Sequence, residues 1–232
     1  MDFREWWAQM RGAAYRGDGA AIVGLLGQNG LSGNVLQLAG EGLLAAVAQG
    51  VEGARDLAAL SVKRLRDRDW YGDGELADLL EGLLAAAMPS LRPLPVDLDE
   101  LAGILEGDPQ QGAGGIDLET GEVWPQFEFE YAETVGEPEP QRWLLVGPEG
   151  TQAGYHDMQM FIGALTDPAL RDLLQAAIER RDAFGDFEDI LADRPDVLDQ
   201  WQAFSEDRKR GRTRSWLAAA GYCPAVPEAP RL

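Results

Sequence analysis

Cysteine and histidine are almost absent from this chain of 232 residues, and lysine is rare. Cys223 is the single cysteine, so the chain cannot form an internal disulfide, which favours a reducing compartment such as the cytoplasm. His156 is the single histidine, which excludes the usual zinc sites built from several histidines and cysteines. A nucleophilic Cys223 would also need a base, and His156 lies far from it in the sequence. We therefore expect Cys223 to be an ordinary apolar residue near the C-terminus.

Long apolar runs and common catalytic motifs are missing as well. No stretch approaches the roughly 18–20 consecutive apolar residues of a transmembrane helix. The first residues, Met1–Trp7, lack the basic start and apolar run of a signal peptide. Neither a GxxxxGK(S/T) phosphate loop nor a GxSxG nucleophile motif occurs. We expect a soluble, cytoplasmic, bacterial-type protein without a membrane segment or cofactor, and the missing motifs favour a non-catalytic function.

The charge of the chain is strongly one-sided. Acidic residues outnumber basic ones by 40 to 20, which gives a formal net charge of −20. The excess is concentrated in residues 95–150, which contain 14 acidic residues and one basic residue, Arg142. Such a charge repels nucleic acids and anionic lipids, and it attracts cations and basic protein surfaces. Solubility alone, or adaptation to high salt, would also account for the acidity.

Apolar residues at helical spacing predict that residues 1–90 form an all-helical N-terminal domain. The leucines between Leu76 and Leu84 recur three and four residues apart, so they share one helix face. Three prolines within residues 89–95 prevent a continuous helix, and the excess of acidic residues begins at the same place. These features predict an extended, proline-rich linker at residues 91–95.

Residues 96–222 are predicted to form a second domain, of the α+β class. The pattern of residues 116–124 predicts a β-hairpin with a two-residue turn at Thr120-Gly121. Residues 127–131 alternate between aromatic and acidic side chains, and residues 142–146 are typical of a more apolar strand. We therefore expect a small antiparallel sheet of three or four strands.

Helical spacing returns after Tyr155 and continues to Leu217. Asp167-Pro168 is typical of a helix start, with a capping side chain followed by proline in the first turn. We expect these C-terminal helices to pack on one face of the sheet. Residues 223–232 contain three prolines and are predicted to form a flexible tail.

Several stretches within residues 96–222 resemble a bacterial family known only as uncharacterised protein family 158. The resemblance rests on the order of Val96–Leu101, Asp117–Glu122, Met158–Ile162 and the residues Phe184, Phe187, Trp201, Phe204, Trp216 and Leu217. It implies a globular fold for this region and no particular activity, and residues 1–90 lie outside it. The family tends to have a basic residue between its two phenylalanines, where this chain has Asp186 and Glu188. That difference argues against nucleic-acid binding by this helix.

An acidic face of the predicted sheet is the main candidate binding site. With a two-residue turn, Glu119 would lie opposite Glu122 and Asp117 opposite Trp124. Like charges in such positions destabilise a hairpin unless solvent, an arginine or a cation offsets them. An acidic edge strand of this kind is suited to holding a basic peptide. The candidate partner-binding residues are Asp117, Glu119, Glu122, Trp124, Glu128 and Glu130.

The same carboxylates leave other interpretations open. Asp117, Glu119, Glu122, Glu128 and Glu130 supply oxygen ligands of the kind that Ca²⁺ and Mg²⁺ prefer, although no calcium-loop spacing is present. The strand rise separates Glu128 from Glu130 by about 6.5–7 Å, which also suits the carboxylate pair of a glycosidase. Nearly every strand with alternating acids has that spacing, so a plain solvated face explains it equally well.

The chain has one basic cluster, Arg208–Arg214, with five basic residues among seven. Its members are Arg208, Lys209, Arg210, Arg212 and Arg214. They suit contact with phosphates, and Trp201 and Trp216 lie near enough in sequence to stack on bases. Alternatively, the segment lies between helices and pairs with acids of the same chain. The net charge of −20 favours this second interpretation.

Taken together, these patterns predict a non-catalytic interaction protein that uses an acidic sheet face to hold a basic protein partner. Two alternatives remain. One is a divergent, cation-dependent hydrolase built on the same carboxylates. The other is a nucleic-acid-associated factor that acts through Arg208–Arg214.

Overall fold

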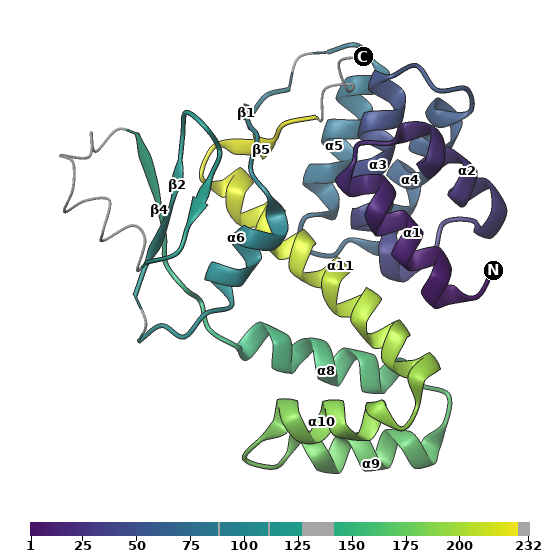
Figure 1. Cartoon of the computed structure of the whole chain (residues 1–232), viewed down its shortest axis with the longest axis vertical. Helices are drawn as coiled ribbons and strands as arrows, with labels where there is room; N and C mark the ends of the chain where they lie inside the picture. Colours follow the sequence, from purple (N-terminus) through teal and green to yellow (C-terminus); the bar gives the residue numbers. More distant parts are fainter. Residues whose placement is uncertain (88, 111, 127–141, 227–232) are drawn as a thin grey trace.

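The computed structural model describes residues 1–87, 89–110, 112–126 and 142–226, and it shows an α+β protein dominated by helices (Figure 1). The N-terminal part is helical, as predicted. Its elements are α1 (Phe3–Tyr15), α2 (Gly19–Asn29), the 3-10 turn η1 (Gly33–Val35), α3 (Leu36–Ala48), α4 (Ala54–Arg68) and α5 (Asp73–Leu84). None of the helices in the described part of the chain is both long and apolar enough to cross a membrane.

Capping side chains explain where the first helices begin. The Asp2 carboxylate accepts a hydrogen bond from the Glu5 N–H, and Asp18 accepts one from the Ala21 N–H. Each bond satisfies a backbone donor that has no partner within its helix. The helices then bury one continuous apolar core, which includes Trp6, Met10, Ile22, Leu26, Leu43, Leu65, Leu76 and Leu80.

A three-stranded antiparallel sheet lies at one end of the molecule, and it confirms the predicted small sheet. Strand β2 (Gly114–Asp117) lies between β3 (Val123–Trp124) and β4 (Trp143–Val146). The predicted strand at residues 127–131 lies outside the described residues. One face of the sheet packs on α6 (Leu98–Leu105) and on the end of α11 (Pro195–Ala219), where Leu217 is fully buried.

A second sheet, with two parallel strands, corrects two predicted boundaries. Strand β1 (Arg92–Leu94) pairs with β5 (Tyr222–Pro224), so that Pro93 lies opposite Cys223. The predicted linker at residues 91–95 is therefore largely a strand, and the predicted tail at residues 223–232 begins inside another. Leu94 and Cys223 are buried, and their burial holds these two proline-containing segments together, at sheet edges where proline is tolerated. The sequence patterns missed this pairing because the partners lie far apart in the chain.

The C-terminal helices α8 (Gln152–Ala164), α9 (Pro168–Ile178) and α10 (Ala183–Ala192) form a small bundle with the first half of α11 (Figure 1). Helix α9 begins as predicted: the Asp167 side chain accepts hydrogen bonds from two backbone N–H groups of the first turn, and Pro168 is the first residue. The aromatic residues predicted to continue the helical pattern meet in the core of this bundle. They are Phe161, Phe187, Trp201 and Phe204.

Helix α11 crosses the middle of the molecule between the N-terminal helices and the other elements (Figure 1). At one point its backbone touches the backbone of the turn between α4 and α5. A Cβ atom on Gly211 would lie 2.2 Å from the Tyr71 carbonyl oxygen, and one on Gly72 would lie 2.1 Å from the Gly211 oxygen. Gly72 also has a φ of +79°, which favours glycine. This crossing therefore requires glycine on both sides.

Candidate functional site

The structure changes the predicted register of the acidic hairpin. Ile116 pairs with Val123, so the turn is longer than the predicted two residues, and Glu119 does not lie opposite Glu122. The cause is local. The Asp117 carboxylate accepts a hydrogen bond from the Glu119 N–H at 2.9 Å, and bonds of this kind compete with the strand ladder and favour a turn.

Asp117 is part of the interior, so the prediction that it lies on an exposed acidic face is wrong. It is 2% exposed, and the Arg142 Nε lies 3.0 Å from both of its carboxylate oxygens. The hydrogen bonds from Arg142 stabilise the charged form and lower the pKa of the Asp117 carboxyl below its ordinary value. Glu119 contacts the same arginine at 3.3 Å but remains exposed, as does Glu122.

The other predicted partner-binding residues are only partly placed. Trp124 is half-buried and packs edge-on against Trp143, with the ring centroids 5.7 Å apart. Glu128 and Glu130 lie outside the described residues. Of the six predicted residues, therefore, Glu119 and Glu122 are the acidic side chains that the described structure presents to solvent.

The basic cluster lies within helix α11 and not between helices. Its five side chains pair with acids of the same chain, as the second interpretation of the sequence held. The pairs are Arg208 with Asp157, Lys209 with Glu106, Arg210 with Glu41, Asp99 and Glu206, Arg212 with Asp157 and Glu106, and Arg214 with Glu41. Arg208 and Arg214 are buried. The phosphate backbone of a nucleic acid therefore cannot contact these two guanidinium groups in the folded protein.

Ion pairs and contacts with an aromatic ring hold the guanidinium groups near the centre of α11. The buried Asp157 carboxylate lies 2.9 Å from Arg208 and 2.5 Å from Arg212. The Trp70 ring lies beneath two guanidinium groups, with the Arg68 group 4.2 Å and the Arg208 group 4.8 Å from its centroid. Cation–π contacts of this kind add attraction where the cation is shielded from water. The centre of α11 is thus fixed by ion pairs and ring contacts where a typical helix would use apolar side chains.

A buried polar network links α11 to the N-terminal helices. Asp73, which is fully buried, accepts hydrogen bonds from the Arg68 Nε at 2.8 Å and from the Gln37 Nε2 at 2.8 Å. Asp207 of α11 accepts one from the Gln37 N–H at 2.7 Å and lies 2.6 Å from Arg68. Two carboxylates thus share one arginine. Burial, together with the negative charge of Asp73, raises the pKa of Asp207 from 3.8 to about 6.

As the pH rises from about 5 to about 7, we expect the free energy of unfolding of the Asp207→Asn variant to increase by about 1 kcal/mol relative to that of the wild type. In the unfolded chain the Asp207 carboxyl ionises near its ordinary pKa of 3.8, whereas in the folded chain it ionises near 6. The wild type therefore loses stability as the pH rises towards and through 6, and asparagine removes this loss. Asparagine also keeps the oxygen that accepts the Gln37 N–H.

Urea unfolding of both proteins at several pH values above the isoelectric point of about 4.3 measures this difference. The control is Asp196→Asn, since Asp196 is an exposed acid on the same helix. A stability difference between Asp207→Asn and the wild type that does not change with pH would contradict the assignment.

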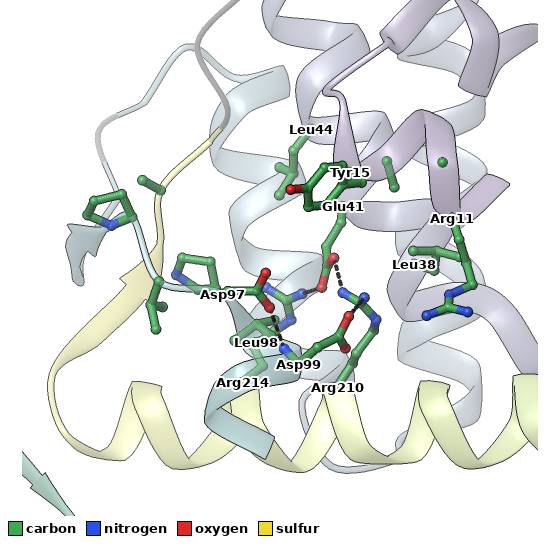
Figure 2. A pocket seen from close by; sticks show the side chains of 16 residues that line it. Arg11, Tyr15, Leu38, Glu41, Leu44, Asp97, Leu98, Asp99, Arg210 and Arg214 are labelled. Atoms are coloured by element: carbon green, nitrogen blue, oxygen red, sulfur yellow. Dashed lines mark hydrogen bonds and ion pairs between the residues drawn. The ribbon is translucent and has the colours of Figure 1, made fainter. Parts of the chain in front are cut away.

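A cavity lies beside α11, where it faces α1, α3 and α6 (Figure 2). Its volume is about 560 Å³. Charged side chains converge in it: Arg210 and Arg214 both contact Glu41, and Arg210 also contacts Asp99. Leucines and prolines form much of the remaining wall, and Tyr15, which is 87% exposed, stands at the edge. This is a partly polar hollow with both charges and apolar surface.

Glu41 and Asp99 are functional candidates that the sequence analysis missed. One signal was present: Glu41 is the single charged residue in the mainly apolar segment Leu36–Ala48. A charge in an apolar helix indicates a buried partner. The spacing of Arg210 and Arg214 by four residues supplies such partners on one face of a helix.

Other candidates from the sequence take ordinary positions. His156 is exposed, while Cys223 is buried, and burial raises the pKa of its thiol. Within residues 1–87, 89–110, 112–126 and 142–226, no group of three or more His, Cys, Asp or Glu side chains is arranged to hold a metal ion. The proposed carboxylate ligands Asp117, Glu119 and Glu122 therefore form no metal site by themselves.

These observations define an α+β protein in which a long, charged helix joins a helical region, a small sheet and a helical bundle. A family model described as an uncharacterised protein family (UPF0158) matches residues 121–229. The chain is also 30% identical over 146 residues to UPF0158 protein PA5073 of Pseudomonas aeruginosa, an alignment that covers 60% of this chain and 92% of the relative. No solved structure matches the chain.

The chain therefore belongs to the uncharacterised protein family UPF0158. This confirms the resemblance that the sequence showed. The family model begins at Gly121, so it leaves out the stretch Val96–Leu101 and most of Asp117–Glu122, on which the resemblance also rested.

Proposed function

We propose that the protein is a non-catalytic interaction module that holds a basic protein partner against acidic side chains around the β2–β3 turn. The observation that carries the proposal is an imbalance of charge. The one base of residues 95–150, Arg142, is held by Asp117 and Glu119. Among the described residues of this segment, exposed acids such as Glu122 and Glu100 have no ion-pair partner. A basic surface would supply the missing charge.

The enclosed bases of α11 strengthen this argument. The four arginines are at most 16% exposed and pair with acids of the same chain, so they offer little positive charge to solvent. The turn also lies against Pro95, because a Cβ on Gly121 would lie 2.4 Å from the Pro95 oxygen. Exposed Asp97 and Glu100 follow Pro95 in the chain, which extends the acidic surface beyond the hairpin.

A cytoplasmic location belongs to the same proposal, since the chain has a single cysteine and needs no oxidising compartment. The hydrolase hypothesis receives less support, because Asp117 is committed to Arg142. The nucleic-acid hypothesis receives less support too, because the α11 bases are paired internally.

The test is the double variant Glu119→Gln/Glu122→Gln. The full chain is used to capture proteins from a nuclease-treated extract of its own host, and the affinity of each captured protein is then measured in purified form. We expect the double variant to bind roughly tenfold more weakly, since each exposed charge contact contributes up to about 1 kcal/mol. The weakening should shrink as salt is added.

The matched control is Glu52→Gln/Asp67→Asn, which removes the same two charges from exposed positions in and before α4. Equal weakening in the control would mean that binding follows net charge alone, which contradicts the proposal. Capture of nucleic acid in place of a protein, before nuclease treatment, would contradict it as well.

A further inference from the structure

Arg214 has an unusual environment for a buried guanidinium group. Its side chain is 1% exposed, its Nε donates to the Gln37 Oε1 at 2.9 Å, and its Nη2 donates to Glu41. Its Nη1 has no hydrogen-bond partner among the described residues. A buried donor of this kind costs about 1–3 kcal/mol when it is left unsatisfied, and more when it is charged.

The same side chain lines the cavity of about 560 Å³ beside α11. Figure 2 shows Arg210 and Arg214 directed towards Glu41 in this hollow. We propose that the cavity binds a small amphipathic carboxylate, such as a medium-length fatty acid, whose carboxylate oxygen accepts a hydrogen bond from the Arg214 Nη1. Asp97 borders both this cavity and the acidic surface, but the cavity contains neither Glu119 nor Glu122, and the proposal does not rest on the function proposed above.

The distribution of charge in the cavity favours an anion at the Arg214 end. Arg210 is surrounded by three carboxylates, those of Glu41, Asp99 and Glu206. Among the described residues, Arg214 forms an ion pair with Glu41 alone, and it shares that carboxylate with Arg210. Burial also lowers the pKa of Arg214 below its ordinary value, because the protein interior disfavours the charged form.

The acids in the wall limit the ligand to a single negative charge. Glu41, Asp97 and Asp99 all line the cavity, and they would repel a doubly charged phosphate more strongly than a carboxylate. A cation would be attracted to these acids but would leave the Arg214 Nη1 without an acceptor. A monoanionic carboxylate satisfies that donor at the least electrostatic cost.

The rest of the cavity suits an apolar chain. Leu38, Leu44, Val96 and Leu98 line it, together with Pro95 and Pro224. The volume lies within the roughly 300–1,000 Å³ that is usual for small-molecule sites. Such a wall contributes affinity through burial of the apolar part of the ligand, while the guanidinium sets its direction.

The experiment uses the full chain and two probes of equal chain length, octanoate and octylamine. At about one hundred times its dissociation constant, octanoate should raise the melting temperature by roughly 5 °C. It should also show saturation-transfer NMR contacts with the protein, whereas octylamine should do neither. The variant Ala14→Trp, which places a large ring in the cavity wall on α1, should remove the octanoate effect.

Ala8→Trp is the matched control, because Ala8 is an exposed residue of α1 that does not line the cavity. This variant should bind octanoate like the wild type. The proposal is overturned if octylamine stabilises the protein as much as octanoate, or if the octanoate effect persists in Ala14→Trp. It is also overturned if octanoate fails to bind the wild type, in which case a buried water is the partner of the Arg214 Nη1.

Discussion

Replacing Asp73 with alanine will lower the free energy of unfolding by about 3 kcal/mol, since it leaves a buried charge without its main partner. Asp73 is fully buried and accepts hydrogen bonds from Arg68, Gln37 and the Trp70 N–H. After the substitution, Asp207 is the one carboxylate partner that Arg68 keeps among the described residues, and the Gln37 amide loses its acceptor. Urea unfolding followed by circular dichroism measures the loss.

The control is Asp78→Ala on the same helix. The Asp78 side chain is 71% exposed and contacts Arg66 at the surface, so its removal should change stability by less than about 1 kcal/mol. Similar effects of the two substitutions would show that the buried network does not stabilise the fold. A second consequence distinguishes the network from simple packing: without the negative charge of Asp73, the pKa of Asp207 should fall towards its ordinary value.

Replacing Gly211 with alanine will lower the free energy of unfolding by about 3 kcal/mol, although alanine is ordinarily the better residue within a helix. The new methyl group would lie 2.2 Å from the carbonyl oxygen of Tyr71, a backbone atom that cannot rotate away. The turn between α4 and α5 must then move off α11. The measurement is again urea unfolding.

The control is Gly163→Ala in α8, for which we expect the opposite result. An added Cβ at Gly163 meets nothing within 4 Å, so this variant should be more stable than the wild type by roughly 0.5–1 kcal/mol. If Gly211→Ala were stabilising as well, this result would contradict the close backbone contact between α11 and the α4–α5 turn.

The sequence predicted those elements whose buried side chains are apolar. The N-terminal helices, the start of α9 at Asp167-Pro168 and strand β4 all follow from periodicity or capping, and the structure confirms them. In each case the apolar side chains that form the core also produce the pattern. Periodicity and burial then carry the same information.

The long helix α11 could not be predicted in this way. Residues 205–215 contain no large apolar side chain, yet Asp207, Arg208 and Arg214 are buried. Here the buried face consists of ion pairs, and an apolar pattern is absent although the segment lies in the centre of the fold. The partners of these charges come from other helices, at separations that range from 51 positions for Asp157 and Arg208 to 173 positions for Glu41 and Arg214.

The hairpin shows a second limit of prediction from the sequence. Its position was predicted correctly, but its register was not, because one hydrogen bond from the Glu119 N–H to the Asp117 carboxylate lengthens the turn. The alternation of apolar and polar residues is the same for both registers near the turn. A single side chain therefore decided which acids face solvent, and with them the extent of the candidate binding surface.

The central position of α11 has a consequence for how the protein is made. Translation proceeds from the N-terminus, so helices α1 to α5 leave the ribosome long before Pro195 begins α11. Until then Glu41 lacks both of its arginines, and strand β1 lacks β5. The early helices therefore remain incompletely assembled until the last part of the chain has been made. A premature stop codon before Pro195 would therefore leave the whole nascent protein exposed to chaperones and proteases.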